Sequence, residues 1–234
     1  KICVAYEGME RFFPADKIVM TGNPIRGIIV PATREMKEAG VKEYGLDPSR
    51  KHIFVVGGSL GSSRFNQCMR KWISDGCPGI DGVDVLWQCG KYYKKGVDEF
   101  MAEQKARNPE VLRHVHHTDF VGRMELAYAA ADVVVSRSGA SSVSELCAAH
   151  KAVIFVPSPN VAEDHQTHNA MALVRKDAAL IVKDADAMEK MIPTALDLLK
   201  DEARIAALEE NAGKMALPDA AGKIAEEVYK LIKD

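Results

Sequence analysis

The sequence predicts an α/β protein built on a Rossmann-like, doubly wound parallel sheet. From residue 51 onward, six apolar segments of strand length alternate with longer segments of helix length, and the connections between them are short. Strands of about five to seven residues that alternate with helices of about 10–15 residues are typical of βαβ units, whose strands run parallel. Six such strands are enough for a doubly wound sheet with helices on both faces.

The predicted elements follow one another in a regular order. The strands are expected at residues 52–58, 83–89, 113–121, 132–136, 152–157 and 178–182. The helices between them are expected at residues 62–74, 93–107, 123–131, from Ser141 onward, and at 164–176. Residues 187–234 are expected to be helical throughout, with one break at Pro218.

The residues before the first of these strands have a weaker pattern. Two short strand-like runs within residues 1–20 are split by residues 12–16, and residues 21–31 have the glycine and proline content of a linker. The sequence begins at Lys1, already inside a strand-like run, so we expect it to be a piece of a longer protein.

Composition and charge exclude several classes of protein. The 31 Lys and Arg residues nearly balance the 33 Asp and Glu residues, so no basic field favours a nucleic-acid partner. No apolar run approaches the ~20 residues that span a bilayer, and no signal peptide is recognisable. The 5 cysteines include no C-x-x-C pair, which favours a reducing compartment. We therefore expect a cytoplasmic globular protein.

The loop after the first strand of the predicted sheet is rich in glycine. Ligands of doubly wound sheets bind at the carboxyl ends of the strands, where Gly57, Gly58 and Gly61 precede a helix. Glycines allow a ligand to approach the backbone, and the helix N-terminus offers free N–H groups to an anion. The loop is neither a Walker A nor a G-x-G-x-x-G motif. A tight turn capped by Ser62 or Ser63 explains it equally well.

The fourth strand is followed by Ser138, Gly139 and a predicted helix. Ser142 and Glu145 have the spacing of a capping box, in which the Glu145 carboxylate accepts a hydrogen bond from the Ser142 N–H. Alternatively, the amides of Ser141 and Ser142 bind a phosphate, and Glu145 accepts hydrogen bonds from a vicinal diol such as a ribose. On these residues alone the capping box is favoured.

The fifth strand is followed by a polar loop at residues 157–170, which leads into Asp164, His165 and Gln166. A capping role for Asp164 competes here with ligand binding. A metal site is not expected, because His165 and His168 lack a third ligand at a suitable spacing.

Two other polar groups have structural explanations. His114 and His116 share one face of a strand and His117 lies on the other, as expected of hydrogen-bonded strand histidines. Asp184 and Asp186 match a D-x-D motif, but their position between a strand and a helix favours helix capping. No G-x-S-x-G motif for nucleophilic catalysis is present.

Five motifs occur in a fixed order along the chain: "TGNPIR", "GGSLGS", "DFVGRM", "SRSGASSVSE" and "EDHQTHNA", followed by "LPDAAGKIAEEV". Together they resemble the MurG family of bacterial glycosyltransferases over essentially the whole chain. Members of that family transfer N-acetylglucosamine from its UDP donor to undecaprenyl-linked muramyl-pentapeptide, which converts lipid I to lipid II in peptidoglycan synthesis. The family has the two-domain GT-B architecture, and the chain is similar to its C-terminal, donor-binding half.

The resemblance implies which residues bind UDP-N-acetylglucosamine. Arg26 would lie at the domain junction, Ser59 at the diphosphate, Val121 and Met124 at the uracil, Glu145 at the ribose and Gln166 at the sugar. Backbone amides at the helix start would wrap the phosphates and the near side of the sugar: Ala140, Ser141, Ser142, Val143 and Ser144. Supporting residues would be Gly57, Gly58, Gly61, Ser138 and Gly139, with His165 and Asn169 as further candidates. Only Gln166 is carried over from a pair of glutamines that is common in the family, because His165 stands at the first of the two positions.

The resemblance also implies a division into domains. Residues 1–26 would end an N-terminal acceptor domain and its linker, residues 27–216 would form the donor domain, and residues 217–234 would form a helix that crosses back. The family's acceptor site lies in the N-terminal domain, so we name no general base. Neither metal nor cofactor is expected, because helix N-termini and loop amides can stabilise the departing diphosphate. The full-length protein is expected at the cytoplasmic face of the inner membrane.

Other interpretations stay open. The chain could be another GT-B enzyme of UDP-sugars, such as a glycolipid glycosyltransferase or a UDP-N-acetylglucosamine epimerase, or a donor-binding subunit that needs a membrane partner. The apolar stripe of the last helix (Ile224, Val228 and Leu231) needs a partner, for which a second copy of the chain is a candidate.

Overall fold

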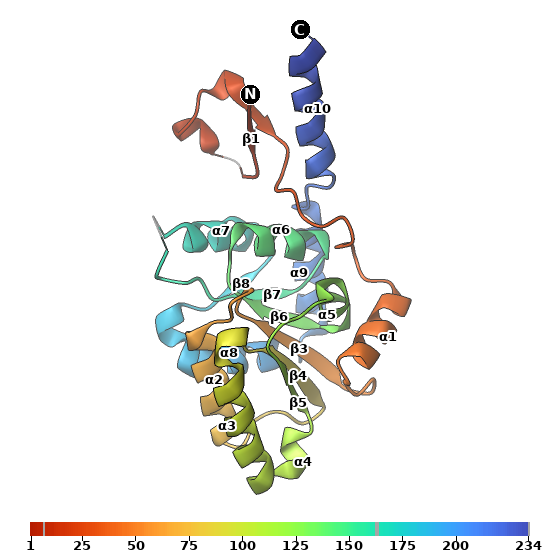
Figure 1. The fold of residues 1–234 in the computed structure, drawn as a ribbon, viewed down its shortest axis with the longest axis vertical. Coiled ribbons are helices and arrows are strands. Elements are labelled where there is room, and N and C mark those ends of the chain that lie inside the picture. The colour runs from red at the N-terminus through yellow and green to blue at the C-terminus, as the bar shows by residue number, and fades with distance from the viewer. Residues whose placement is uncertain (7, 162–163, 234) are drawn as a thin grey trace.

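The computed structural model describes residues 1–6, 8–161 and 164–233. Its main sheet has six parallel strands in the order β5-β4-β3-β6-β7-β8 (Figure 1). The strands are β3 (Lys51–Val56), β4 (Val83–Gln88), β5 (Val115–Thr118), β6 (Val133–Ser136), β7 (Val153–Phe155) and β8 (Leu180–Ile181). Each lies inside the segment predicted for it, apart from Lys51 at the start of β3. The strand order reverses between β3 and β6, which confirms the doubly wound sheet.

Helices cover both faces of this sheet. Helices α2 (Ser63–Ser74), α3 (Lys94–Arg107) and α8 (Ala187–Leu198) pack on one face, and α1 (Arg34–Glu43), α5 (Met124–Ala130), α6 (Ala140–Ala148) and α7 (His165–Val174) pack on the other. Successive strand side chains point to opposite faces, so Ile53 and Val55 join the first core while Phe54 and Val56 join the second. Both faces of β3 are therefore buried, which explains why its sequence is apolar without alternation.

Helix α1 is not predicted from the sequence. Its ten residues are mostly charged, and only Gly40 and Val41 are buried. A Cβ at Gly40 would overlap the Leu126 carbonyl of α5, so glycine permits the two helices to approach closely. Glycine in a helix interior lowers local helix propensity, and this is why α1 gives a weak sequence signal.

The C-terminal tail has more breaks than predicted. It forms α8, α9 (Glu202–Lys214) and α10 (Ala220–Lys233), so it is interrupted before Glu202 as well as near Pro218. At the first break the Asp201 side chain accepts a hydrogen bond from the Arg204 N–H at 2.9 Å. This N-cap starts a new helix and accounts for the unpredicted interruption.

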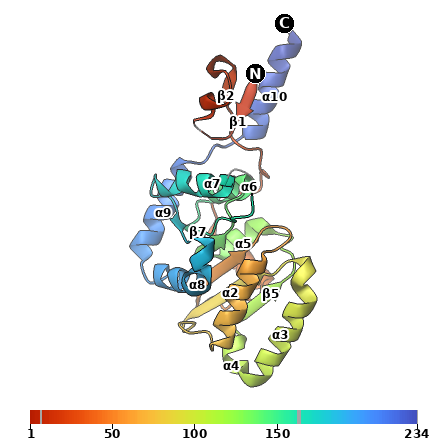
Figure 2. The same ribbon diagram turned by 90° about the vertical axis from the view of Figure 1, so that its left-hand side faces the viewer.

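A second, small sheet lies apart from the main one. Strands β1 (Ile2–Val4) and β2 (Ile18–Met20) match the two predicted strand-like runs and pair in parallel. Helix α10 lies beside them in both ribbon views (Figures 1 and 2). Several apolar side chains of α10 are exposed: Val228, Tyr229, Leu231 and Ile232.

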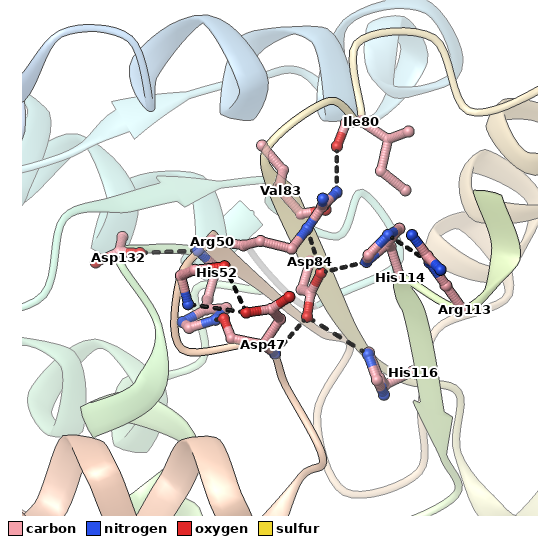
Figure 3. A network of polar contacts seen from close by, with 11 residues as sticks. Asp47, Arg50, His52, Ile80, Val83, Asp84, Arg113, His114, His116 and Asp132 are labelled. Atoms are coloured by element: carbon pink, nitrogen blue, oxygen red, sulfur yellow. Dashed lines mark hydrogen bonds and ion pairs between the residues drawn. The ribbon is translucent and has the colours of Figure 1, made fainter. Parts of the chain in front are cut away.

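Polar residues gather around the buried Asp84 at the amino ends of β3, β4 and β5 (Figure 3). Asp84, whose side chain is 1% exposed, lies 2.7 Å from Arg50 Nε and 2.9 Å from His114 Nδ1. It also accepts a hydrogen bond from the Asp47 N–H at 2.7 Å. His116 Nε2 lies 3.7 Å from the same carboxylate. We call Asp84, Arg50, His114 and His116 the amino-edge cluster.

The positions of the three histidines confirm the predicted faces. His114 and His116 both approach Asp84, whereas His117 points to the opposite face and lies 2.8 Å from Asp98 of α3. His116 departs from the prediction in one respect, because its Nε2 makes no hydrogen bond. The cluster lies at the opposite edge of the sheet from the carboxyl ends, and therefore away from the edge where ligands of such sheets bind.

Candidate functional site

A cavity of about 500 Å³ opens at the carboxyl ends of the strands. It is lined by Gly57, Gly58, Gly61, Ser62, Ser63, Arg64, Gln67, Arg137, Ser158, Pro159, Asn160, Gln166 and Asp184. We call it the carboxyl-edge cavity. Its walls come from the segments after β3, β6, β7 and β8 and from the first turns of α2 and α7, so it includes the point where the strand order reverses. Doubly wound sheets bind their ligands at this point.

The glycine loop after β3 is shaped by its own packing. Gly58 and Gly61 have φ values of +92° and +78°, and a Cβ at Gly61 would overlap the Cys89 carbonyl. The Ser62 hydroxyl caps α2 by accepting a hydrogen bond from the Phe65 N–H at 3.3 Å. The tight-turn interpretation is therefore confirmed. It leaves room for a ligand, since a Cβ at Gly58 would meet open space and the start of α2 lines the cavity.

Arg137 joins the loops around the cavity and was not among the predicted site residues. Its guanidinium donates to Asp184 at 2.7 Å, to the Val156 carbonyl at 2.8 Å and to the Ser62 hydroxyl at 3.0 Å. The sequence signal was present, because an arginine directly after a buried strand lies at the ligand-binding edge of the sheet.

The capping role predicted for Asp184 and Asp186 is wrong. Asp184 pairs with Arg137 and, at 3.0 Å, with Arg64, while the Asp186 side chain makes no cap bond to α8. Two guanidinium groups within reach form charge-assisted hydrogen bonds, which are stronger than a neutral bond to a backbone amide. Asp184 therefore partly neutralises two arginines that line the cavity.

The capping box predicted at Ser142 and Glu145 is also wrong. Helix α6 begins at Ala140, and its N-cap is Gly139, three residues before Ser142. The Val143 N–H already donates to the Gly139 carbonyl at 2.9 Å, and the amide of Ser144 lies inside the helix. The N–H groups that remain without an intrahelical partner belong to Ala140, Ser141 and Ser142.

The Glu145 carboxylate is bound by the side chains of Arg26 and Tyr128, and not by the backbone of α6. Its Oε1 accepts hydrogen bonds from Arg26 Nη2 at 3.0 Å and Arg26 Nε at 3.3 Å, and its Oε2 accepts one from the Tyr128 hydroxyl at 3.2 Å. The fold thus brings together Arg26 and Glu145, two predicted site residues far apart in the sequence. Tyr128 was not predicted, because an apolar helix stripe gave no reason to single it out.

The loop after β7 is tied to the start of α6. The Gln166 side chain accepts a hydrogen bond from the Ser158 N–H at 2.9 Å and lines the carboxyl-edge cavity. The buried Ser138 donates to the Gln166 carbonyl at 2.8 Å, and Asn169 Nδ2 donates to the Ser138 carbonyl at 3.0 Å. Asn169 therefore supports the loop through Ser138.

Asp164 occupies the N-cap position of α7, but its side chain makes no hydrogen bond to the helix backbone. It precedes the helix in a left-handed conformation with φ of 50°, and its Oδ1 accepts from the Thr167 hydroxyl at 2.7 Å instead of from a backbone amide. His165 is exposed at the first position of α7. Two residues of the predicted polar loop, 162 and 163, lie outside the described residues.

The remaining predicted residues do not line the cavity. Ser59 is exposed on the glycine loop, Val121 is buried after β5, and Met124 is the first residue of α5. The predicted residues that make the contacts described above form two groups, one around the cavity and one around Glu145, and Ser138 links Gln166 to the loop before α6.

The chemistry of this edge suits an anion that carries hydroxyl groups. The free amides at the start of α6 and the guanidinium groups of Arg64 and Arg137 favour negative charge, and Glu145 can accept from a diol. No cluster of three or more His, Cys, Asp or Glu side chains suited to a metal ion occurs among the described residues. In that same part of the chain, no helix has the length and apolar character needed to cross a membrane.

Two solved structures have the same fold. The crystal structure of Acinetobacter baumannii MurG matches with a TM-score of 0.69 and 22% identity, and covers 97% of this chain and 59% of that one. A glycosyltransferase from Rickettsia africae matches with a TM-score of 0.64 and 16% identity, and covers 94% of this chain and 58% of that one. These matches confirm the predicted fold, the C-terminal half of a GT-B glycosyltransferase.

Curated relatives are much closer in sequence. A "UDP-N-acetylglucosamine--N-acetylmuramyl-(pentapeptide) pyrophosphoryl-undecaprenol N-acetylglucosamine transferase" of Bacteroides thetaiotaomicron is 48% identical over 232 residues, which are 98% of this chain and 60% of the relative. The Flavobacterium psychrophilum protein of the same name is 43% identical over 236 residues, with 100% and 60% covered. The chain thus spans about 60% of the length of the curated relatives it matches. Residues 52–224 match the Glycosyltransferase family 28 C-terminal domain. A match over this length places the chain in glycosyltransferase family 28.

Proposed function

We propose that this protein transfers N-acetylglucosamine from UDP-N-acetylglucosamine to undecaprenyl-diphospho-N-acetylmuramoyl-pentapeptide, so that lipid I becomes lipid II. The observation that supports this most strongly is the 48% identity, over nearly the whole chain, to a transferase of that name. In this proposal the reaction takes place at the cytoplasmic face of the inner membrane.

The donor is proposed to lie along the carboxyl edge of the main sheet. Its diphosphate would meet the amides at the start of α6, its ribose hydroxyls would meet Glu145, and its sugar would meet Gln166. The acceptor hydroxyl attacks the anomeric carbon while UDP leaves with inversion. Amides and guanidinium groups fixed around the departing diphosphate stabilise the negative charge that grows there.

The domain division is part of the same proposal. Residues 27–216 would bind the donor, residues 1–26 would lead in from an acceptor domain, and residues 217–234 would cross back to it. The side-by-side arrangement of β1, β2 and α10 supports this grouping (Figure 2). The exposed apolar side chains of α10 would contact that domain or, in its absence, a second copy of the chain.

We expect the protein to bind UDP at least tenfold more tightly than ADP or GDP. The backbone after β5, around Val121, is held by a buried side chain and would read the uracil edge through fixed N–H and C=O groups. Isothermal titration calorimetry with the three nucleotides under the same salt and pH measures this difference. Equal affinities would remove the uridine assignment, and binding of a different UDP-sugar in preference to UDP-N-acetylglucosamine would favour another GT-B enzyme.

We expect these 234 residues to bind UDP-N-acetylglucosamine without transferring the sugar. Holding the acceptor hydroxyl against the anomeric carbon can lower the barrier by ~7–11 kcal/mol, and we propose that the acceptor binds outside the donor domain. The measurement is UDP release with a lipid I analogue present, with a full-length relative as the positive control. A turnover of ~1 per second or more would place the catalytic residues inside this chain.

A further inference from the structure

The hydroxyl of Tyr128, a residue of the packed core, is hydrogen-bonded to a carboxylate of the candidate site. Tyr128 is 3% exposed and lies on α5, with its ring in edge-to-face contact with Phe54 of β3 at a centroid distance of 6.1 Å. Its hydroxyl donates to Glu145 Oε2 at 3.2 Å. A buried phenol is stable when its one polar group has a partner, and Glu145 is that partner here.

The two oxygens of Glu145 are held in different ways. Oε2 is bound by Tyr128 from inside the protein, whereas Oε1 is bound by Arg26, whose side chain is 47% exposed and comes from an irregular segment. An exposed ion pair contributes little and is easily exchanged for another partner, whereas a buried hydrogen bond fixes geometry. The carboxylate is therefore anchored on its inner side and accessible on its outer side.

We propose that Tyr128 is a positioning residue, whose hydroxyl orients the Glu145 carboxylate toward the vicinal hydroxyls of a nucleotide ribose. This inference rests on the proposed function, because it takes Glu145 as the group that meets the ribose. Tyr128 does not touch the nucleotide. It acts by limiting Glu145 to one rotamer, so that the second oxygen presents its lone pairs at the carboxyl edge.

Burial, and then the charge of Glu145, raise the pKa of Tyr128 above its ordinary value of 10. The phenol therefore stays protonated at neutral pH and remains a hydrogen-bond donor to the carboxylate. The raised pKa of Tyr128 therefore agrees with the hydrogen bond that its hydroxyl donates to Glu145.

The test replaces Tyr128 by Phe, which keeps the ring and its contact with Phe54 and removes only the hydroxyl. We expect the affinity for UDP to fall about fivefold, less than for the loss of a direct hydrogen bond between UDP and a charged group, because Tyr128 acts only through Glu145. The affinity for 2′,3′-dideoxy-UDP should be unchanged, because that ligand makes no contact with Glu145. The ratio of the affinity for UDP to the affinity for the dideoxy nucleotide, measured by calorimetry, should therefore fall by the same factor.

Tyr44→Phe is the matched control. Its hydroxyl donates to the Arg123 carbonyl at 2.9 Å, beside the start of α5, and does not contact Glu145. It should leave the preference for UDP over the dideoxy nucleotide unchanged. In a Glu145→Ala background, Tyr128→Phe should have no further effect on UDP affinity.

The outcomes separate this inference from the proposed function. If the wild type prefers UDP over the dideoxy nucleotide and Tyr128→Phe keeps the full preference, the positioning role is overturned while the proposed function stands. If the wild type binds the two nucleotides equally, the positioning role and the ribose assignment of Glu145 are overturned, while the transfer reaction stands. If the wild type does not bind UDP, the proposed function is overturned as well.

If Tyr128→Phe fails to fold by circular dichroism, 3-fluorotyrosine placed at position 128 provides a nearly isosteric second measurement. Its fluorine resonance should move on addition of UDP and stay in place with the dideoxy nucleotide. A resonance that responds equally to both would overturn the positioning role.

Discussion

Replacing Asp84 by Asn is expected to lower the free energy of unfolding by about 3–5 kcal/mol, the cost of breaking a buried ion pair by removing one partner. The carboxylate forms an ion pair with Arg50, contacts His114 Nδ1 and accepts a hydrogen bond from the Asp47 N–H. An amide has only one acceptor oxygen, and its NH2 group would face other donors. For a chain of this size the melting temperature should fall by about 10 °C in thermal denaturation followed by circular dichroism.

Asp98→Asn is the matched control for this variant. Asp98 also pairs with a histidine of β5, His117, at 2.8 Å, but its side chain is 44% exposed. Exposed pairs contribute about 0–1 kcal/mol, so this variant should melt close to the wild type. Equal melting temperatures for the two variants would show that the amino-edge cluster contributes no more than a surface ion pair.

The same cluster predicts how stability depends on pH. Burial alone would raise the pKa of Asp84, but the neighbouring His116, the Asp47 N–H and His114 outweigh it and lower the pKa to about 2. A carboxylate whose folded pKa lies below its unfolded value stabilises the fold fully above the unfolded value, near 4. This contribution, up to about 2 kcal/mol, should be lost as the pH falls from about 5 toward 2. Urea denaturation across this range should show a smaller loss for Asp84→Asn than for the wild type.

Replacing Glu145 by Ala is expected to weaken UDP binding by roughly 10- to 150-fold. This range corresponds to losing hydrogen bonds to a charged group, about 1.5–3 kcal/mol. The fold should also lose about 1–3 kcal/mol, because the buried Tyr128 hydroxyl is left without its partner, whereas the Arg26 pair is exposed and α6 does not depend on Glu145 for its cap. Calorimetry with UDP and thermal denaturation of the same samples measure the two effects separately.

Glu209→Ala is the control for the loss of a paired carboxylate. Glu209 of α9 lies 3.3 Å from the buried Lys151 and does not contact the carboxyl edge. We expect Glu209→Ala to reduce the melting temperature and to leave UDP affinity at its wild-type value. If Glu145→Ala instead changes only the melting temperature, Glu145 is a structural residue and the ribose assignment fails.

Much of the fold could be predicted from the sequence because its signals are local. A strand such as β3 is buried on both faces, so a continuous apolar run between turn residues marks it. Ser62 caps α2, one of the two caps considered, and His116 and His117 lie on opposite faces of β5, because capping and strand alternation depend on residues a few positions apart. The order of the motifs was likewise sufficient to indicate the family before the fold was known.

What only the tertiary structure decided involves residues far apart in the chain. Asp184 looked like a helix cap until the fold placed Arg64 and Arg137 beside it, and Glu145 looked like part of a capping box until Arg26 and Tyr128 reached it. Charged side chains take the strongest partner within reach, and that partner depends on how the strands are ordered. The packing of α1 through Gly40 against α5 likewise joins residues far apart in the chain. The start of α6 at Ala140 was also not evident from the local sequence. Local preference sets where helices and strands can form, whereas their contacts across the sheet decide where each helix begins and which partner each carboxylate binds.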